Sequence, residues 1–237
     1  QLRVQIDNVV GNQELVLGTS QYTNGSGEPF TVTTLNYYLS NFRFRRTDGS
    51  EYVVPQDSSY FLVKESDKAS QLLTFRNLPV GDYSAVTFTI GVDSLRSTAN
   101  ISERTGVLNP AGSATAPNDM YWAWNSGYIF LKLEGLSPRA PVDATGLNLF
   151  QYHIGLFGIP INNTRTVSLP FGTDVAKVTT GQLPVVTLKA NVLTIFDGST
   201  AVSIAQHPEV MVNPFSATIA NNYSTLFRYD HLDQTTY

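Results

Sequence analysis

Apolar and polar residues alternate along most of the chain, in short runs that glycine, proline and asparagine interrupt. Runs of this kind occupy 2–7, 14–18, 30–46, 52–54, 60–63, 72–75, 85–92, 128–133, 147–155, 164–169 and 185–196. A period of two residues is typical of half-buried β-strands. Turn signals that recur about every ten residues favour a sandwich or barrel. We therefore predict an all-β fold, an antiparallel β-sandwich with long loops, as a single domain over 1–237.

The same pattern predicts the core, because every second residue of a strand faces one side of its sheet. The predicted core residues are Leu35, Tyr37, Leu39, Phe88, Ile90, Phe130, Leu188 and Val192. Near the end of the chain the spacing becomes helical. Asn213 and Pro214 are typical of a helix start, and Phe215 and Ile219 follow four residues apart. We predict one short C-terminal helix that ends before Asp230.

The alternation stops over 93–119, where glycine, serine, threonine, alanine, asparagine and proline dominate. A loop of this length in a compact domain is either functional or an excursion over the surface. Because it leads directly into the tryptophan-bearing segment 118–128, we predict a structured cover beside a site. A disordered insertion is the alternative.

The segment 118–128 contains both tryptophans, Trp122 and Trp124, together with Met120. In an extended segment the two indoles project from the same face. Polar Asn118, Asp119, Asn125 and Ser126 flank them, which indicates a rim or cleft rather than a closed core. The alternative is that the indoles simply fill the core of a sandwich.

Composition narrows the classes of partner and site. The chain has 237 residues, a net charge of -4 and only 14% charged residues, so we expect no nucleic-acid partner. No apolar run approaches the roughly 18 residues of a transmembrane helix. The sequence has no cysteine, which excludes disulfides, thiolate catalysis and cysteine-ligated metals.

Three histidines, His153, His207 and His231, are the nitrogen donors available to a metal. None lies at short ligand spacing from another, so a site would have to be assembled from distant segments. Met211 lies four residues after His207. A set of imidazole and thioether donors suits Cu(I). The alternatives are that His153 is a hydrogen-bonded core residue and that His231 stabilises a helix end.

Acidic residues indicate a second candidate metal, calcium. Four carboxylates, those of Asp93, Glu103, Asp119 and Glu134, border the long loop and are candidate calcium ligands. No nucleophile-elbow or phosphate-loop motif occurs, so we expect a protein without enzymatic activity. A third class is a carbohydrate- or protein-binding module, whose aromatic platform would consist of Tyr121, Trp122, Trp124 and Tyr128.

Five blocks, in order along the chain, resemble the signature of the MbnP-like family. They are LNYYLSN at 35–41, LPVGDY at 78–83, FTIGVD at 88–93, MYWAWNSGY at 120–128 and YHIG at 152–155. The family comprises secreted bacterial copper-binding proteins related in part to MopE and CorA. The resemblance implies a β-sandwich that is exported, either periplasmic or anchored as a lipoprotein at the outer membrane or cell surface.

The resemblance also implies a site. In the copper-binding relatives, two histidines and a kynurenine derived from tryptophan hold copper, and a partner di-haem enzyme of the cytochrome c peroxidase type oxidises the tryptophan. Trp122 or Trp124 would match the modified residue, His153 the YHIG histidine and His207 the second ligand. Met120, Tyr121 and Tyr128 would line the site. The relatives have a histidine near the tryptophan block, but here the block reads Trp-Ala-Trp. As an alternative, copper would therefore be bound in the region of His207 and Met211.

Overall fold

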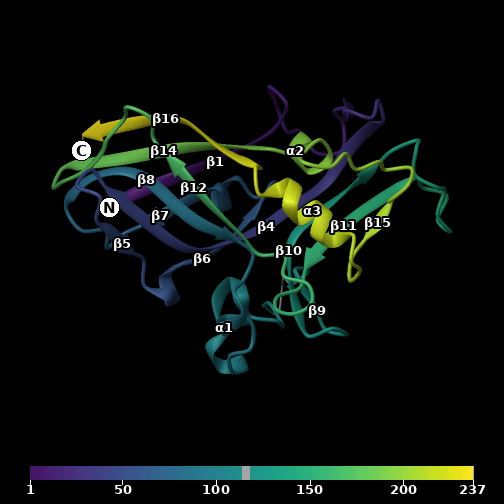
Figure 1. Cartoon of the computed structure of the whole chain (residues 1–237), viewed down its shortest axis with the longest axis horizontal. Coiled ribbons are helices and arrows are strands. Elements are labelled where there is room, and N and C mark those ends of the chain that lie inside the picture. The colour runs from purple at the N-terminus through teal and green to yellow at the C-terminus, as the bar shows by residue number, and fades with distance from the viewer. Residues whose placement is uncertain (114–117, 237) are drawn as a thin grey trace.

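The computed structural model describes residues 1–113 and 118–236, which form two β-sheets joined by a common core (Figure 1). The first sheet contains β1 (Leu2–Val10), β2 (Gln13–Glu14), β7 (Leu72–Phe75), β14 (Gln182–Asn191) and β16 (Phe227–Thr236). The second contains β3 (Tyr22–Thr23), β4 (Pro29–Arg46), β5 (Glu51–Val53), β6 (Tyr60–Lys64), β8 (Gly81–Ile90), β9 (Tyr121–Trp122), β10 (Gly127–Leu136), β11 (Leu149–Gly155), β12 (Arg165–Pro170), β13 (Ala176–Val178) and β15 (Glu209–Val210).

Helices are few and short. They are α1 (Ser94–Ser97), α2 (Leu193–Phe196) and α3 (Ser216–Tyr223), with 3-10 turns η1 (Gln56–Ser58), η2 (Lys68–Gln71), η3 (Ile101–Glu103) and η4 (Gly106–Leu108). The predicted all-β sandwich is therefore confirmed. The helix predicted near the C-terminus is α3, but the chain then returns to the first sheet as β16, which the sequence pattern did not predict (Figure 1).

Most strand pairs are antiparallel, as predicted. Two are parallel: β1 with β14, and β11 with β15. The central path of the second sheet runs β12-β8-β4-β10-β11-β15, so β4 and β10 lie in its middle and β15 at one edge. The second parallel pair matters for the site, because it sets the residues after β15 beside the end of β11.

Successive side chains along β4 belong to two different apolar clusters, one on each side of the second sheet. Tyr37 belongs to the large cluster between the sheets, whereas its neighbour Tyr38 belongs to a smaller cluster. Successive side chains of a strand point to opposite faces, so the two clusters lie on opposite sides of the second sheet. We call the side with the smaller cluster the outer face. All eight predicted core residues are buried, although Phe130 lies in the smaller cluster.

One strand prediction is wrong at its C-terminal end. The apolar run 185–196 predicted a single strand, but β14 ends at Asn191 and 193–196 form α2. The side-chain amide oxygen of Asn191 accepts from the backbone N–H groups of Gly11 and Leu193, which turns the chain out of the sheet. Ile195 and Phe196 are buried although they lie in a helix, so the apolar run correctly indicated burial but not the type of secondary structure.

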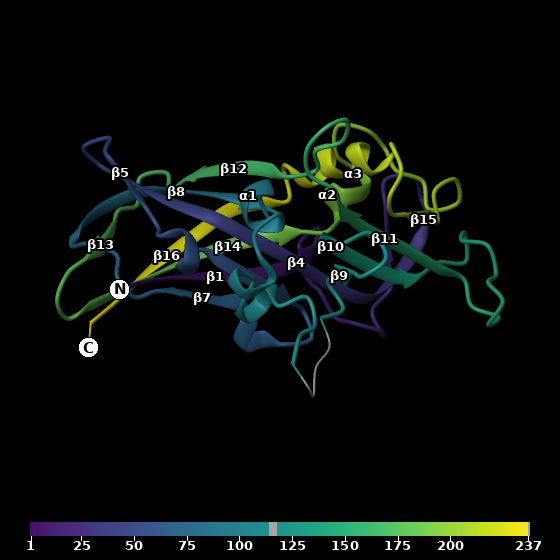
Figure 2. The same ribbon diagram turned by 90° about the horizontal axis from the view of Figure 1, so that it is seen from below.

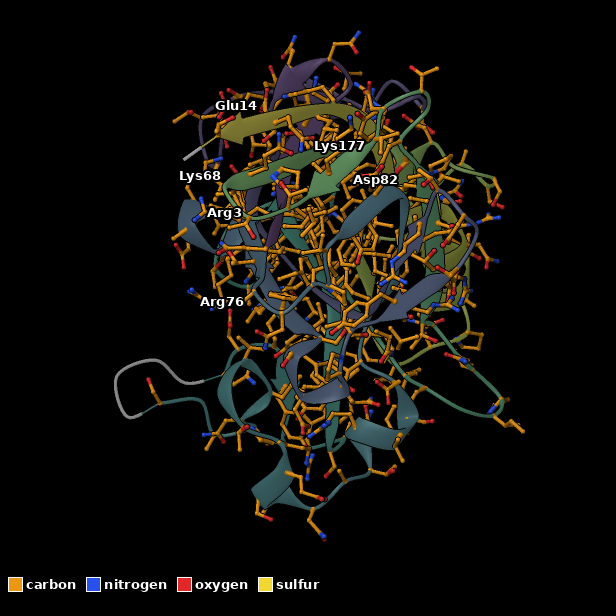
Figure 3. All side chains as sticks on the ribbon, turned by 90° about the vertical axis from the view of Figure 1, so that its left-hand side faces the viewer. Arg3, Glu14, Lys68, Arg76, Asp82 and Lys177 are labelled. Atoms are coloured by element: carbon orange, nitrogen blue, oxygen red, sulfur yellow. The ribbon has the colours of Figure 1, made fainter. Side chains whose placement is uncertain are left out.

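Figure 3 views the molecule from the side opposite β11 and β15 and labels charged residues of both signs. Lys177 on β13 is opposite Asp82 on β8. Lys68 lies 3.8 Å from Glu14, beside the C-terminal end of β1, and 2.5 Å from the buried carboxylate of Glu65. The exposed Lys68–Glu14 pair contributes little to stability.

Candidate functional site

The excursion after β8 is structured over its described residues, 93–113 and 118–120; residues 114–117 of the predicted cover lie outside the described residues. Asp93 anchors its start. The Asp93 carboxylate accepts from the Tyr60 hydroxyl at 2.6 Å, the Asn41 amide at 3.1 Å and the Arg96 backbone N–H at 3.0 Å. Burial alone would raise the pKa of Asp93, but these hydrogen bonds outweigh it and lower the pKa.

The tryptophans lie in a hairpin formed by β9 and the N-terminal end of β10, beside the excursion that contains α1 (Figures 1 and 2). Trp122 is the last residue of β9 and pairs with Gly127. The chain between them turns, with Ser126 at φ 50°, so the segment is not extended through Trp124, and the condition for both indoles to share a strand face is not met. The indoles are nevertheless neighbours, with ring centroids 5.8 Å apart. Trp122 is 5% exposed and Trp124 69%.

Trp122 packs directly over the end of β11. A Cβ atom built on Gly155 would lie 2.7 Å from Cζ3 of Trp122 and 2.4 Å from the Tyr128 carbonyl oxygen. Contacts this close leave no space for a side chain, so glycine is required for the indole to sit here. Gly155 ends the YHIG block, two residues after His153 and on the same face of the strand.

His153 projects from the outer face of the second sheet, opposite Lys132 on β10. Its Nε2 lies 2.7 Å from Oε1 of Glu134, and the side chains are only 11% and 18% exposed. Glu134 also lies 3.7 Å from Lys132 Nζ. The hydrogen bond from His153 and the nearby Lys132 charge outweigh burial and lower the pKa of Glu134 to about 2. Glu134 is therefore an ionised acceptor at neutral pH.

Met211 reaches the same face from β15. Val210, the last residue of β15, pairs with Tyr152 in parallel register, and Met211 follows it in a bend beyond the strand. The Met211 side chain packs against the smaller cluster, which also contains Trp122 and Met120. Met211 therefore lies on the same side of the second sheet as His153 and Trp122.

His207 packs against a different cluster. Its ring stacks on Phe215, with centroids 3.6 Å apart, and Phe215 packs against the large cluster between the sheets. The loop that carries His207 is held by buried Glu28, whose carboxylate accepts from the backbone N–H groups of Ile204 at 2.7 Å and Ala205 at 3.0 Å. Met211, by contrast, packs against the smaller cluster.

The third histidine lies on β16 in the first sheet. His231 contacts the carboxylates of Asp230, at 2.9 Å, and Asp233, at 3.3 Å. The hydrogen bond to Asp230 raises the pKa of His231. This position is within a strand and not after a helix, so the predicted role at a helix end is wrong.

The four acidic calcium candidates do not converge on a cation site. Asp93 is bonded to its own neighbours, and Asp119 lies between Lys64, at 3.6 Å, and Lys132, at 3.5 Å. Glu134 contacts the same Lys132, so an ammonium group already occupies the space between these two carboxylates. Glu103 caps η3 by accepting from the Asn100 N–H. In the described ranges no three His, Asp or Glu residues form a metal-binding group.

The predicted aromatic platform is not presented to solvent. Trp122 and Tyr128 are buried and Tyr121 is half-buried, which leaves Trp124 as the exposed ring of the four. Tyr128 donates to the Leu108 carbonyl at 2.5 Å, and Arg104 lies 5.9 Å from the centre of the Tyr121 ring. These contacts fix the excursion to the hairpin and leave no flat row of rings for a sugar.

The donors at the end of β11 fit a soft metal better than a hard one. The imidazole of His153 lies on β11, the thioether of Met211 directly follows β15 on the same side of the sheet, and Glu134 is hydrogen-bonded to Nε2 of the imidazole. Sequence patterns missed the roles of Glu134 and Gly155, because both depend on the pairing of β10 with β11. The sequence pattern that could have indicated part of this site is the period-two run 147–155, which places His153 and Gly155 on one face of a strand.

Comparison with known proteins identifies the family of the chain. No curated protein matches the chain. The solved structure "MbnP from Methylosinus trichosporium" is similar with a TM-score of 0.50 and 14% sequence identity, over 84% of this chain and 78% of that one, which supports the fold. No helix among the described residues is long and apolar enough to span a membrane. The sequence model of the MbnP family matches residues 1–212, and the chain therefore belongs to the MbnP family.

Proposed function

We propose that this protein is an exported copper-binding protein without enzymatic activity, and that His153 and Met211 bind Cu(I) beside Trp122. The observation that supports the proposal is the parallel register of β11 with β15, in which Val210 pairs with Tyr152, so that the next residues of the two segments are His153 and Met211. The packing of Trp122 over Gly155 adds the indole to the same place. Membership of the MbnP family supports an exported, copper-handling role.

The donor types support Cu(I) over zinc or calcium. Thioether and imidazole are soft and borderline ligands that suit Cu(I), and the chain has no cysteine that would favour zinc. Calcium requires six to eight oxygen ligands, whereas the carboxylates nearby are already paired with lysines. Copper bound here would be held at a half-buried position at the rim of the outer face, since Met211 is partly exposed.

The proposal includes a modified tryptophan. Conversion of Trp122 to kynurenine would cleave the C2–C3 bond of the indole with two oxygen atoms from dioxygen or a peroxide, catalysed by a di-haem cytochrome c peroxidase-like partner, and hydrolysis would then release the C2 carbon as formate, a net loss of one carbon and gain of one oxygen. Trp122 is favoured over Trp124 because its ring packs at the end of β11. Trp124, the exposed neighbour at 5.8 Å, is the indole that a partner would reach first.

A Cu(I) competition titration tests the site. We expect one Cu(I) per chain, and affinity at least about tenfold weaker, or about 1.4 kcal/mol, in each of His153→Ala and Met211→Leu. His207→Ala is the matched control, because its ring stacks on Phe215, and it should bind as wild type does. Equal affinity in wild type and all three variants would contradict the proposed site. Circular dichroism checks that each variant is folded.

Protein from the native host tests modification and export. Intact mass should exceed the value calculated from the sequence by the difference between one oxygen and one carbon atom, and Trp122→Phe should abolish the increase. Cell fractionation should find the protein in the periplasm or at the outer membrane. An unmodified mass in copper-replete cells would contradict the kynurenine, and a cytoplasmic location would contradict export.

A further inference from the structure

Glu134 and His153 are diagonal neighbours across the β10–β11 pair. Glu134 is opposite Gln151 and His153 is opposite Lys132, so the two side chains share the outer face one step apart along the strands. Diagonal neighbours lie within reach of long side chains. Here they meet, with 2.7 Å between Oε1 of Glu134 and Nε2 of His153.

The chemistry of the pair determines where the imidazole proton lies. An ionised carboxylate only accepts hydrogen bonds, so Nε2 of His153 must donate. A neutral imidazole has a single N–H, which leaves Nδ1 with its lone pair. Among the described residues Nδ1 has no hydrogen-bond partner. Histidines that bind metals usually donate their other N–H to a carboxylate or carbonyl in this manner.

The carboxylate is itself held in place. Lys132 lies 3.7 Å from Oε1 of Glu134, and Asp119 lies 3.5 Å from Lys132. Asp119 immediately precedes Met120 at the start of the tryptophan hairpin, and it also contacts Lys64 at 3.6 Å. The series Asp119, Lys132, Glu134 and His153 therefore connects the base of the hairpin to the imidazole. Its first member, Asp119, is 46% exposed, and the other three side chains are 11–18% exposed.

We infer that Glu134 is a positioning residue for the proposed copper site: its carboxylate orients the His153 ring and keeps the proton on Nε2, so that Nδ1 is the nitrogen presented to the metal. The statement that Nδ1 is presented to copper rests on the proposed function. The statement that Glu134 keeps the proton on Nε2 concerns the metal-free protein and does not depend on copper binding. Glu134 does not itself bind the metal, because its nearest carboxylate oxygen is engaged by His153 and Lys132.

The first readout is the ¹⁵N chemical shifts of His153 in the metal-free protein at neutral pH. Wild type should show a protonated Nε2 and a bare Nδ1 at limiting values. Glu134→Ala should move both shifts toward the averaged values of a freely exchanging imidazole. Glu209→Gln is the matched control: it removes a carboxylate from the neighbouring strand β15, and in the described part of the chain no hydrogen bond joins Glu209 to His153, so the shifts should stay at their wild-type values.

The second readout is Cu(I) affinity, which should fall roughly 10–100-fold in Glu134→Ala, the range typical for loss of a carboxylate behind a ligating histidine. A protonated Nδ1 in wild type, unchanged nitrogen shifts in Glu134→Ala, or wild-type copper affinity in that variant would each overturn the inference. If wild type itself binds no Cu(I), the proposed function fails, whereas the nitrogen shifts still decide whether Glu134 sets the tautomer.

Discussion

Replacing Gly155 by alanine tests the contact that places Trp122 at the end of β11. The new methyl group would lie 2.7 Å from Cζ3 of Trp122 and 2.4 Å from the Tyr128 carbonyl oxygen. The carbonyl belongs to β10, which pairs with β11 at this point, so it cannot move without disturbing the sheet. The indole must therefore shift, or the end of β11 must separate from β10.

Overpacking of this kind costs roughly 1–3 kcal/mol. In a chain of this size each kcal/mol lowers Tm by about 2–4 °C, so we expect Gly155→Ala to melt roughly 2–12 °C below wild type. Gly127→Ala is the matched control. Gly127 lies in the same hairpin, and a Cβ atom there would meet nothing closer than 3.8 Å, so its Tm should change little.

Tryptophan fluorescence reports whether the indole itself moves. In a Trp124→Phe background the emission comes from Trp122 alone, which is buried in the native protein. Gly155→Ala should shift this emission to longer wavelength as the indole gains contact with water, and Gly127→Ala should not. If Gly155→Ala matched Gly127→Ala in both Tm and emission, the packing described for Trp122 would be refuted.

Two further predictions concern stability. Leu39→Ala removes a fully buried side chain from the large cluster and should cost about 2–5 kcal/mol in chemical denaturation; an unchanged midpoint would show that Leu39 is not in the core. Because the pKa of Glu134 is lowered from 4.5 to about 2, its ion pair stabilises the protein above pH 4.5 and this contribution disappears as pH falls toward 2. After discounting for solvent screening we expect about 1–2 kcal/mol. The difference in unfolding free energy between wild type and Glu134→Gln should shrink over this range, and a difference independent of pH would contradict the assignment.

The sequence predicted the fold where the local pattern and the tertiary structure agree. Leu35, Tyr37 and Leu39 alternate with outward residues along β4, and the structure buries all three. The period-two pattern failed in two places, in a buried helix and in an exposed edge strand. Ile195 and Phe196 are buried from α2, and β16 has a mostly exposed pattern because it lies at the edge of the first sheet.

The site was predictable only in part, because its members are far apart in sequence. Period two placed His153 and Gly155 on one face, and the family signature directed attention to the tryptophans. Nothing local indicates that β15 pairs in parallel with β11 or that His207 stacks on Phe215. His207 and Met211 thus pack against different clusters, and the loop before His207 is held by Glu28 from a distant strand.

The central claim, a copper site formed by His153 and Met211, is tested most directly by X-ray absorption at the copper K-edge of the Cu(I)-loaded protein. Sulfur and nitrogen scatterers are distinguishable by distance, since metal–thiolate or thioether bonds are longer than metal–imidazole bonds. We predict a sulfur scatterer in wild type and in His207→Ala that is absent from Met211→Leu, and a nitrogen contribution reduced in His153→Ala. A spectrum without sulfur in wild type, or one that Met211→Leu leaves unchanged, would contradict the claim.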